Sequence, residues 1–220
     1  MTADEILAAF ALPAQAMVNQ RIPKKLLLEN GAPTGADKRV INEGIEELIW
    51  VASLKPTTIG VPAYEDTERQ YLEIAVLTVA YRERARTGRL RELIHRAIPY
   101  PVVLIGSDGV LSLAELRHAQ NEAGKMVLDG ELLAIDPVPI LPKLALARQP
   151  TTDLASLYRS WYSLILPLVR RAERLADIDA LRREAAKEPQ LARRVELNLK
   201  IKRLSADNAE SSADDAEGRR

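Results

Sequence analysis

The stretch QYLEIAVLTVAY, residues 70–81, decides how this chain folds. Apolar residues stand so densely in it that neither face is left for water, and they are Leu72, Ile74, Val76, Leu77, Val79 and Ala80. Branched apolar residues at this density are typical of a strand that is buried on both faces. We therefore predict one long strand over residues 70–81, placed centrally in its sheet.

A helix and three further strands are predicted downstream of this strand. Thr87 can cap the helix, which carries a continuous apolar stripe until Pro99 ends it. The motif Ser107-Asp108-Gly109 supplies turn residues that tolerate positive φ, so the strands on either side of it should pair as a hairpin. The three strands are expected over residues 101–106, 110–116 and 126–135, the last bent at Gly130.

Two elements are predicted before the central strand. Asp37 can cap a helix whose apolar residues recur at helical spacing on one face. These residues are Ile41, Ile45, Leu48 and Ala52. Lys55-Pro56 ends this helix, and residues 57–61 are predicted to form a short strand.

Prolines mark the end of this first domain. Three of them between positions 137 and 142 break the pattern, and the linker that contains them ends near Pro150, where we place the domain boundary. Beyond it, one helical segment is predicted over residues 151–176, with a kink at Pro167, and a second over residues 177–188.

A final helix should begin at Pro189, whose missing N–H would be unsatisfied in a first helical turn in any case. It should end near Leu204, because only small and charged residues remain beyond it, and such a tail is expected to be disordered. The predicted fold is α+β. It comprises a mainly antiparallel sheet of about five strands flanked by two helices over residues 1–150, a C-terminal helical hairpin or coiled extension over 151–204, and a disordered tail over 205–220.

The composition excludes several classes of function. The 220 residues carry 31 basic and 31 acidic side chains, so no overall field attracts nucleic acid or an anionic membrane. Cysteine is absent, which removes disulfides, thiolate chemistry and sulfur-ligated zinc. The chain shows neither a signal peptide nor the ~20 apolar residues that span a bilayer, so we expect a cytoplasmic protein without a membrane partner.

Residues capable of catalysis or metal binding do not form a recognisable site. His95 and His118 lack a neighbouring nucleophile with an orienting carboxylate, and both are expected at the surface. Asp66 and Glu73 have the layout of the acidic pair in a metal-dependent nuclease, but Ala75 stands where that pattern requires lysine. No glycine-rich phosphate loop is found. We therefore assign no catalytic residue, no metal ligand and no cofactor.

Arginine is concentrated at the end of the central strand and in the helix after it. The six arginines are Arg82, Arg84, Arg86, Arg89, Arg91 and Arg96. Several guanidinium groups could thus lie near one phosphate backbone, which predicts a nucleic-acid contact, although no aromatic residue for base stacking occurs in this stretch. The alternative interpretation is a solvated helix face.

The final helix, within KEPQLARRVELNLKIKRL at residues 187–204, carries one asparagine in its apolar stripe. In coiled coils a single buried asparagine sets register and oligomer state. This pattern predicts an interface with a partner or with a second copy. Its residues are Leu191, Arg194, Val195, Asn198, Ile201 and Lys202. In the alternative interpretation Asn198 packs within the chain against the helix of residues 151–176.

Several short motifs occur in one order along the chain. They are Asn19-Gln20-Arg21-Ile22-Pro23-Lys24-Lys25, Ile49-Trp50, Leu54-Lys55-Pro56-Thr57-Thr58-Ile59, Ala97-Ile98-Pro99-Tyr100, Leu111-Ser112-Leu113-Ala114 and Val195-Glu196-Leu197-Asn198. By this series the chain resembles a bacterial family of unknown function, domain of unknown function 4391, from about Leu12 to Leu204. Members tend to be encoded beside helicases and DNA methyltransferases, in loci that look like restriction or phage-defence islands.

The resemblance implies an accessory role in DNA handling. Similar proteins tend to carry a histidine where Pro101 stands, and a histidine-lysine-arginine triplet where this chain has Glu115-Leu116-Arg117. If the triplet contacts phosphate in similar proteins, Arg117 is the one basic residue at these three positions that could make the contact here. We therefore add it to the six arginines as a candidate for binding nucleic acid.

We expect a non-enzymatic accessory protein of a DNA-modification or phage-defence locus, which docks to a helicase or DNA methyltransferase partner through its C-terminal helices. Two alternatives are kept. One is a nucleic-acid hydrolase in which Asp66, Glu73 and a histidine converge on folding. The other is a structural subunit that self-assembles into a homo-oligomer through the same helices.

Overall fold

The central strand predicted over residues 70–81 is present, but it is broken at residues 72 and 73. In the computed structural model, which describes residues 1–118 and 126–217, Gln70–Tyr71 forms β4 and Ile74–Tyr81 forms β5. Leu72, between them, is 43% exposed, and the Glu73 carboxylate accepts a hydrogen bond from the Ser53 hydroxyl. β5 is largely buried and has a strand on each side, as predicted.

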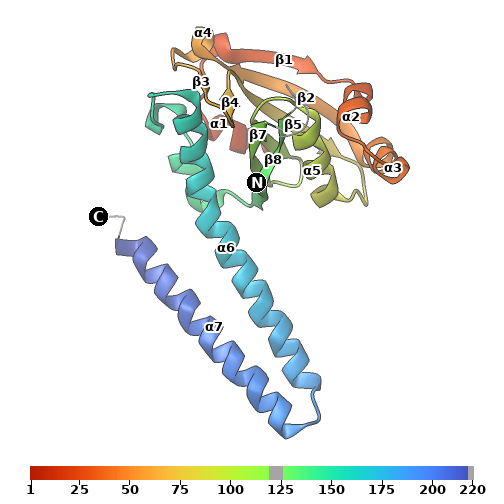
Figure 1. The fold of residues 1–220 in the computed structure, drawn as a ribbon, viewed down its shortest axis with the longest axis vertical. Coiled ribbons are helices and arrows are strands. Elements are labelled where there is room, and N and C mark those ends of the chain that lie inside the picture. Colours follow the sequence, from red (N-terminus) through yellow and green to blue (C-terminus); the bar gives the residue numbers. More distant parts are fainter. Residues whose placement is uncertain (119–125, 218–220) are drawn as a thin grey trace. The chain divides into compact units, whose positions relative to one another are not determined.

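Six strands form the main sheet, in the order β1, β2, β5, β6, β7, β8 (Figure 1). Besides β5 they are β1 (Met17–Arg21), β2 (Ile45–Leu54), β6 (Val102–Gly106), β7 (Leu111–His118) and β8 (Met126–Ile135). β5 and β6 run parallel, and the other neighbours run antiparallel. The sheet thus has six strands. It is mixed because a crossover helix between β5 and β6 makes these two strands parallel. A mainly antiparallel sheet of about five strands had been expected.

The prediction was wrong for residues 45–54, which form β2 rather than the second half of a helix. Only residues 35–44 are helical, as α3 (Gly35–Gly44), and Thr34 rather than Asp37 is the capping residue. The pairing of β2 with β5 shifts register twice, between Ile45 and Glu47 and between Trp50 and Ala52. Each bulge adds a residue, so buried positions recur at spacings that mimic a helical period.

Residues 56–59 were also assigned wrongly, since α4 (Pro56–Ile59) is a single helical turn where a strand was expected. The Thr58 side chain explains the turn: its hydroxyl accepts a hydrogen bond from the Lys55 N–H and lies 2.8 Å from the Ser53 carbonyl oxygen. A separate two-stranded sheet follows, in which β3 (Tyr64–Glu65) pairs with β4.

Three helices, rather than the two predicted, cover one face of the sheet (Figure 1). They are α2 (Lys24–Asn30), α3 and α5 (Thr87–Ala97). Apolar residues from each helix pack on alternate residues of β5, and the cluster includes Leu27, Ile41, Leu93, Ala75, Leu77 and Val79. The Arg82 N–H donates a hydrogen bond to the Gly44 carbonyl oxygen, so the β5–α5 loop begins beside the end of α3.

The opposite face is covered by α1 (Ala3–Ala9) and by the first turns of α6 (Leu154–Lys187). The Tyr158 hydroxyl accepts a hydrogen bond from the Ala114 N–H at 3.0 Å and lies 2.9 Å from the Val102 carbonyl oxygen. Short 3-10 turns connect the layers at η1 (Ala14–Ala16), η2 (Val138–Lys143) and η3 (Leu146–Arg148). These contacts fix the start of α6 to the sheet, and the first compact unit spans Met1–Ile165.

The second compact unit, Leu166–Arg220, contains the rest of α6 and α7 (Leu191–Glu217), which form the predicted helical hairpin (Figure 1). α6 continues through Pro167, so residues 154–187 are one helix rather than two segments. α7 includes residues 205–217, for which a disordered tail was expected, and residues 218–220 lie outside the described part. Within the described ranges, no helix is long and apolar enough to cross a membrane.

Candidate functional site

The six arginines between residues 82 and 96 have two kinds of surroundings. On α5, Arg89 contacts Asp37 at 2.8 Å and Glu92 at 2.6 Å, and Arg96 contacts Glu92 at 2.8 Å. The Thr34 hydroxyl and the Arg89 guanidinium lower the pKa of the Asp37 carboxyl, which keeps it charged. These bonds link α3 to α5, so Arg89 and Arg96 are already neutralised within the protein.

Arg91 points into the protein and is only 6% exposed. Its guanidinium forms an ion pair with Asp108 of the β6–β7 turn and lies 5.6 Å from the ring centre of Tyr81. Gly106 is required beneath this pair, because a Cβ there would collide with the Asp108 carboxylate. Arg91 therefore cannot reach a phosphate at the surface, contrary to the expectation from sequence.

His95 is 1% exposed, so the expectation of a surface residue was wrong. Its Nε2 lies 3.2 Å from the Ser112 hydroxyl, which is also buried. Burial, followed by the positive charge of Arg91, lowers the pKa of His95 to about 3, and the imidazole stays neutral at physiological pH. His118, at the end of β7, is partly exposed.

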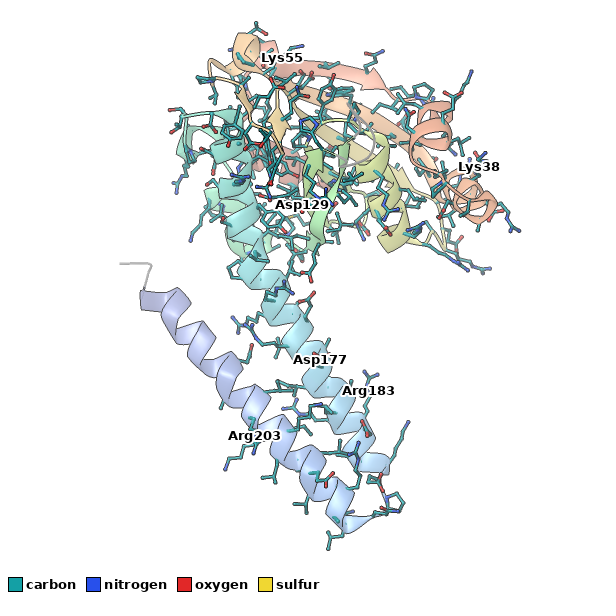
Figure 2. All side chains as sticks on the ribbon, viewed as in Figure 1. Lys38, Lys55, Asp129, Asp177, Arg183 and Arg203 are labelled. Carbon is teal, nitrogen blue, oxygen red and sulfur yellow. The ribbon has the colours of Figure 1, made fainter. Side chains whose placement is uncertain are left out.

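Arg117 lies in a separate ionic network on β7 and β8. Its Nε lies 3.6 Å from Asp129, which also contacts Arg69 at 2.6 Å. Figure 2 shows Asp129 among the side chains of the first unit. Glu115 extends the network, since it contacts both Arg69 at 3.4 Å and Arg159 at 3.1 Å. The structure thus places Arg117 in an ion pair and does not bring it together with the arginines of residues 82–86.

The remaining arginines, Arg82, Arg84 and Arg86, are all exposed on the loop between β5 and α5. We call them the loop arginines. In the part of the chain that the structure describes, none of the three forms an ion pair with a carboxylate. Arg84 has a φ of 63°, in the left-handed region that residues other than glycine rarely adopt.

A pocket of about 430 Å³ opens beside these arginines. Arg84 and Arg86 line it together with Arg39, Glu43 and Glu83. Arg39 belongs to α3, where Figure 2 shows its neighbour Lys38 reaching outward. Sequence reasoning missed Arg39, because it stands far from the loop in the chain and only the packing of α3 against α5 brings the two together.

The acidic residues of the hydrolase alternative do not converge on a metal site. The Asp66 carboxylate is occupied by the Tyr64 hydroxyl at 2.6 Å and by the backbone N–H groups of Glu68 and Arg69. Glu73 instead accepts a hydrogen bond from Ser53. Across residues 1–118 and 126–217, no group of three or more histidine, aspartate or glutamate residues is arranged to hold a metal ion.

The sequence-predicted stripe of α7 is divided between two faces of the helix. Ile201 of the predicted stripe is half-buried and lies on the same side of α7 as Leu197, which is 3% exposed, and Ile178 and Ala185 of α6 are buried as well. Arg193 of α7 contacts Glu184 of α6 at 3.5 Å. This contact joins the two helices of the hairpin.

The other face of α7 is exposed. Leu191 is 66% exposed, Val195 48% and Leu199 53%, and Asn198 and Lys202 lie at the surface beside them. We call these five residues the exposed stripe of α7. Asn198 therefore does not pack against the earlier helix, which had been the alternative expectation. Figure 2 labels Arg203 on α7 and Arg183 on α6, two of the basic residues that surround the hairpin.

Comparisons with curated proteins and with solved structures give no match. A family model described as Domain of unknown function (DUF4391) matches residues 10–207, a span that includes the whole sheet, the loop arginines and the exposed stripe of α7. This match confirms the resemblance that the short motifs indicate. Since it covers most of the chain, the protein belongs to the DUF4391 family.

Proposed function

We propose that this chain is a non-enzymatic accessory protein that docks through α7 to a helix of a DNA-processing enzyme. The observation that carries the proposal is the exposed stripe of α7, an apolar surface that the rest of the helical hairpin does not cover. The family resemblance, by which similar proteins stand beside helicases and DNA methyltransferases, supports a partner from one of these two classes.

The spacing of the stripe favours a helical partner. Leu191, Val195, Asn198 and Lys202 follow one another at intervals of four, three and four residues. This alternation keeps all four on one side of a helix and is the seam on which a second helix packs. The hairpin contact uses a different side of α7, centred on Leu197, so a partner could bind without opening the hairpin.

The size of the apolar surface indicates reversible docking. Completing the burial of Leu191, Val195 and Leu199, which are already about half covered, would contribute about 1 kcal/mol each. Association costs at least about 4 kcal/mol in lost translational and rotational freedom. The partner helix would bury apolar surface of its own, and the charges of Lys202 in the seam and of Arg194 call for acidic residues on that helix.

The test measures binding of the full chain to the helicase or methyltransferase encoded beside it. The variant Leu191→Glu/Val195→Glu should weaken binding at least about tenfold, because it places two charges in the seam. Leu175→Glu is the matched control, since Leu175 is 44% exposed on α6 and away from the stripe. Circular dichroism of both variants should match the parent protein.

Light-scattering mass of the chain alone separates docking from self-assembly. A monomer whose mass rises only with the neighbouring enzyme supports the proposal. A stable homo-oligomer that the Leu191→Glu/Val195→Glu variant dissociates overturns it in favour of a self-assembling subunit. Equal loss of partner binding in Leu175→Glu would show that the exposed stripe of α7 is not the binding surface.

A further inference from the structure

Basic side chains from four separate elements lie along α3 and beside its end. Lys24 of α2 donates a hydrogen bond to the Asn42 carbonyl oxygen at 3.2 Å, and Arg82 donates to the same oxygen at 3.4 Å. Arg21 follows at the end of β1, and Arg39 lies on α3 itself. The folded chain thus places cations side by side that are dispersed in the sequence.

These cations repel one another, and the ion pairs that could offset the repulsion are few. Burial and then the charges of Arg82 and Arg21 lower the pKa of Lys24, which places the three groups close together. Arg21 contacts Glu47, but at 3.6 Å and with its own side chain 70% exposed. Within the described ranges, Lys24 and Arg39 form no ion pair with a carboxylate. An anion bound here would relieve this repulsion.

We propose that these cations and the loop arginines form one site for the phosphate groups of a nucleic-acid strand. The members of this phosphate rim are Arg21, Lys24, Arg39, Arg82, Arg84 and Arg86. The site differs from the arginine stretch seen in the sequence, because Arg89, Arg91 and Arg96 are excluded and three residues from earlier elements are added. The inference does not depend on docking through α7.

The layout of the rim suits a chain of phosphates rather than a single one. Arg84, Arg86 and Arg39 line the 430 Å³ pocket. A second hollow of about 280 Å³ lies beyond the end of α3 and is lined by Arg21 and Lys24. One hollow is lined by Gly44 at the end of α3 and the other by Glu46 just after it. Cations spread over two such hollows match successive phosphates along a backbone, which binds by charge and without reading sequence.

Carboxylates in both hollows limit which anion fits. Glu43 and Glu83 line the first hollow, and Glu46 and Glu47 line the second. They would repel a compact, highly charged anion that filled either hollow. A phosphodiester carries one negative charge per phosphate and spreads its charge along the rim, so it meets more cations than carboxylates.

Two backbone features support the same site. α5 begins at the loop arginines with neither a side-chain cap nor an acidic residue in its first turn, so its positive end has no charge partner within the helix. Arg84 is held at a positive φ, a conformation that costs about 1 kcal/mol for a residue with a side chain. Such strain is retained where it positions a functional side chain.

The experiment measures binding of the full chain to fluorescent 20-nucleotide single strands and duplexes by anisotropy, at several salt concentrations. The variant Arg82→Gln/Arg84→Gln/Arg86→Gln should lower affinity at least about tenfold, and Lys24→Gln should reduce the slope of log affinity against log salt by about 0.7 to 0.9. Lys143→Gln/Arg148→Gln is the matched control, since both side chains are exposed on the 3-10 turns.

Each outcome decides for or against the rim. Loss of binding in the loop and Lys24 variants, with the control within about twofold, supports it. An equal loss in the control indicates a diffuse charge effect and overturns it. A nucleoside triphosphate that competes at micromolar concentration, while no oligonucleotide binds, shows a small phosphate ligand and overturns the strand assignment. Absence of binding to every phosphate probe overturns the site altogether.

Discussion

The arginines of α5 and the arginines of the loop before it have opposite surroundings. Arg89, Arg91 and Arg96 of α5 are paired with carboxylates, and one of them is buried. The loop arginines are exposed and unpaired within the described chain. Residues 82–96 look uniform in sequence, yet half of their arginines hold the fold together and the other half form no ion pair within the described residues.

The partners that make this difference come from distant segments. Asp37 reaches Arg89 from α3, and Asp108 reaches Arg91 from the β6–β7 turn. A local count of charge cannot show either pairing. Basic clusters in sequence therefore indicate where arginines are, while the fold determines which of them remain available.

The largest effect is expected from removing Arg91, the buried arginine of α5. Arg91→Ala removes a buried ion pair and leaves Asp108, which is about one-third exposed, without its partner. We expect the free energy of unfolding in urea to fall by about 2–3 kcal/mol. Arg84→Ala in the loop should change it by less than about 0.5 kcal/mol. Similar losses in both variants would erase the distinction between the two groups.

A second expected effect comes from His95, one turn beyond Arg91 on α5. The unfolded chain binds a proton near the ordinary pKa of 6.5, whereas burial holds the folded value at about 3. The free energy of unfolding should therefore fall as pH falls through this window, by about 1.4 kcal/mol per unit, or about 2 kcal/mol between pH 6.5 and 5.

The matched comparison is His95→Gln, which keeps a hydrogen-bonding group near Ser112 and removes the titration. Its own stability can differ from that of the parent, so the slope against pH is the quantity to compare. The variant should lose the slope between pH 6.5 and 5 in urea unfolding measurements. Parallel pH profiles for the two proteins would show that His95 is solvated in the folded state.

A smaller effect is expected for the half-exposed pairs. Arg89→Gln removes the link between Asp37 and Glu92, with the Arg89 side chain 35% exposed, and should lower the free energy of unfolding by about 1 kcal/mol. Arg96→Gln removes only one surface contact and should lower it by about 0.3 kcal/mol. A thermal unfolding series checks this order, and a larger loss for Arg96→Gln than for Arg89→Gln would contradict it.

The sequence was sufficient to predict the elements for which apolar density and turn residues indicate the same structure. β5 and β6 were predicted from dense apolar runs, and the turn at Gly109, which has a φ of 75°, from its residue types. β2 was missed because two bulges disturb its alternation, and a bulge is set by the neighbouring strand rather than by the residues themselves. The parallel pairing of β5 with β6 depends likewise on the path of the helix between them.

The candidate sites show the same limit. The exposed stripe of α7 could be read from the spacing of Leu191, Val195 and Asn198, but which side of α7 faces α6 could not. Ile201 was predicted to belong to the stripe, but in the folded hairpin it is half-buried on the side of Leu197. For the phosphate rim, Lys24 lay within a family motif, yet nothing local connected it with Arg82.

The last expected change is a small gain in stability, and it bears most directly on the loop. Arg84 has a φ of 63°, which glycine adopts without strain, so Arg84→Gly should raise the free energy of unfolding by about 0.5 kcal/mol once the greater freedom of unfolded glycine is deducted. The same variant should weaken oligonucleotide binding, because it removes a cation from the pocket. Arg84→Asn keeps a side chain that tolerates this conformation and separates strain from charge. A variant that gains stability and loses oligonucleotide binding would show that the strained Arg84 serves binding. A gain in stability with unchanged binding would show that the strain at Arg84 is unrelated to binding.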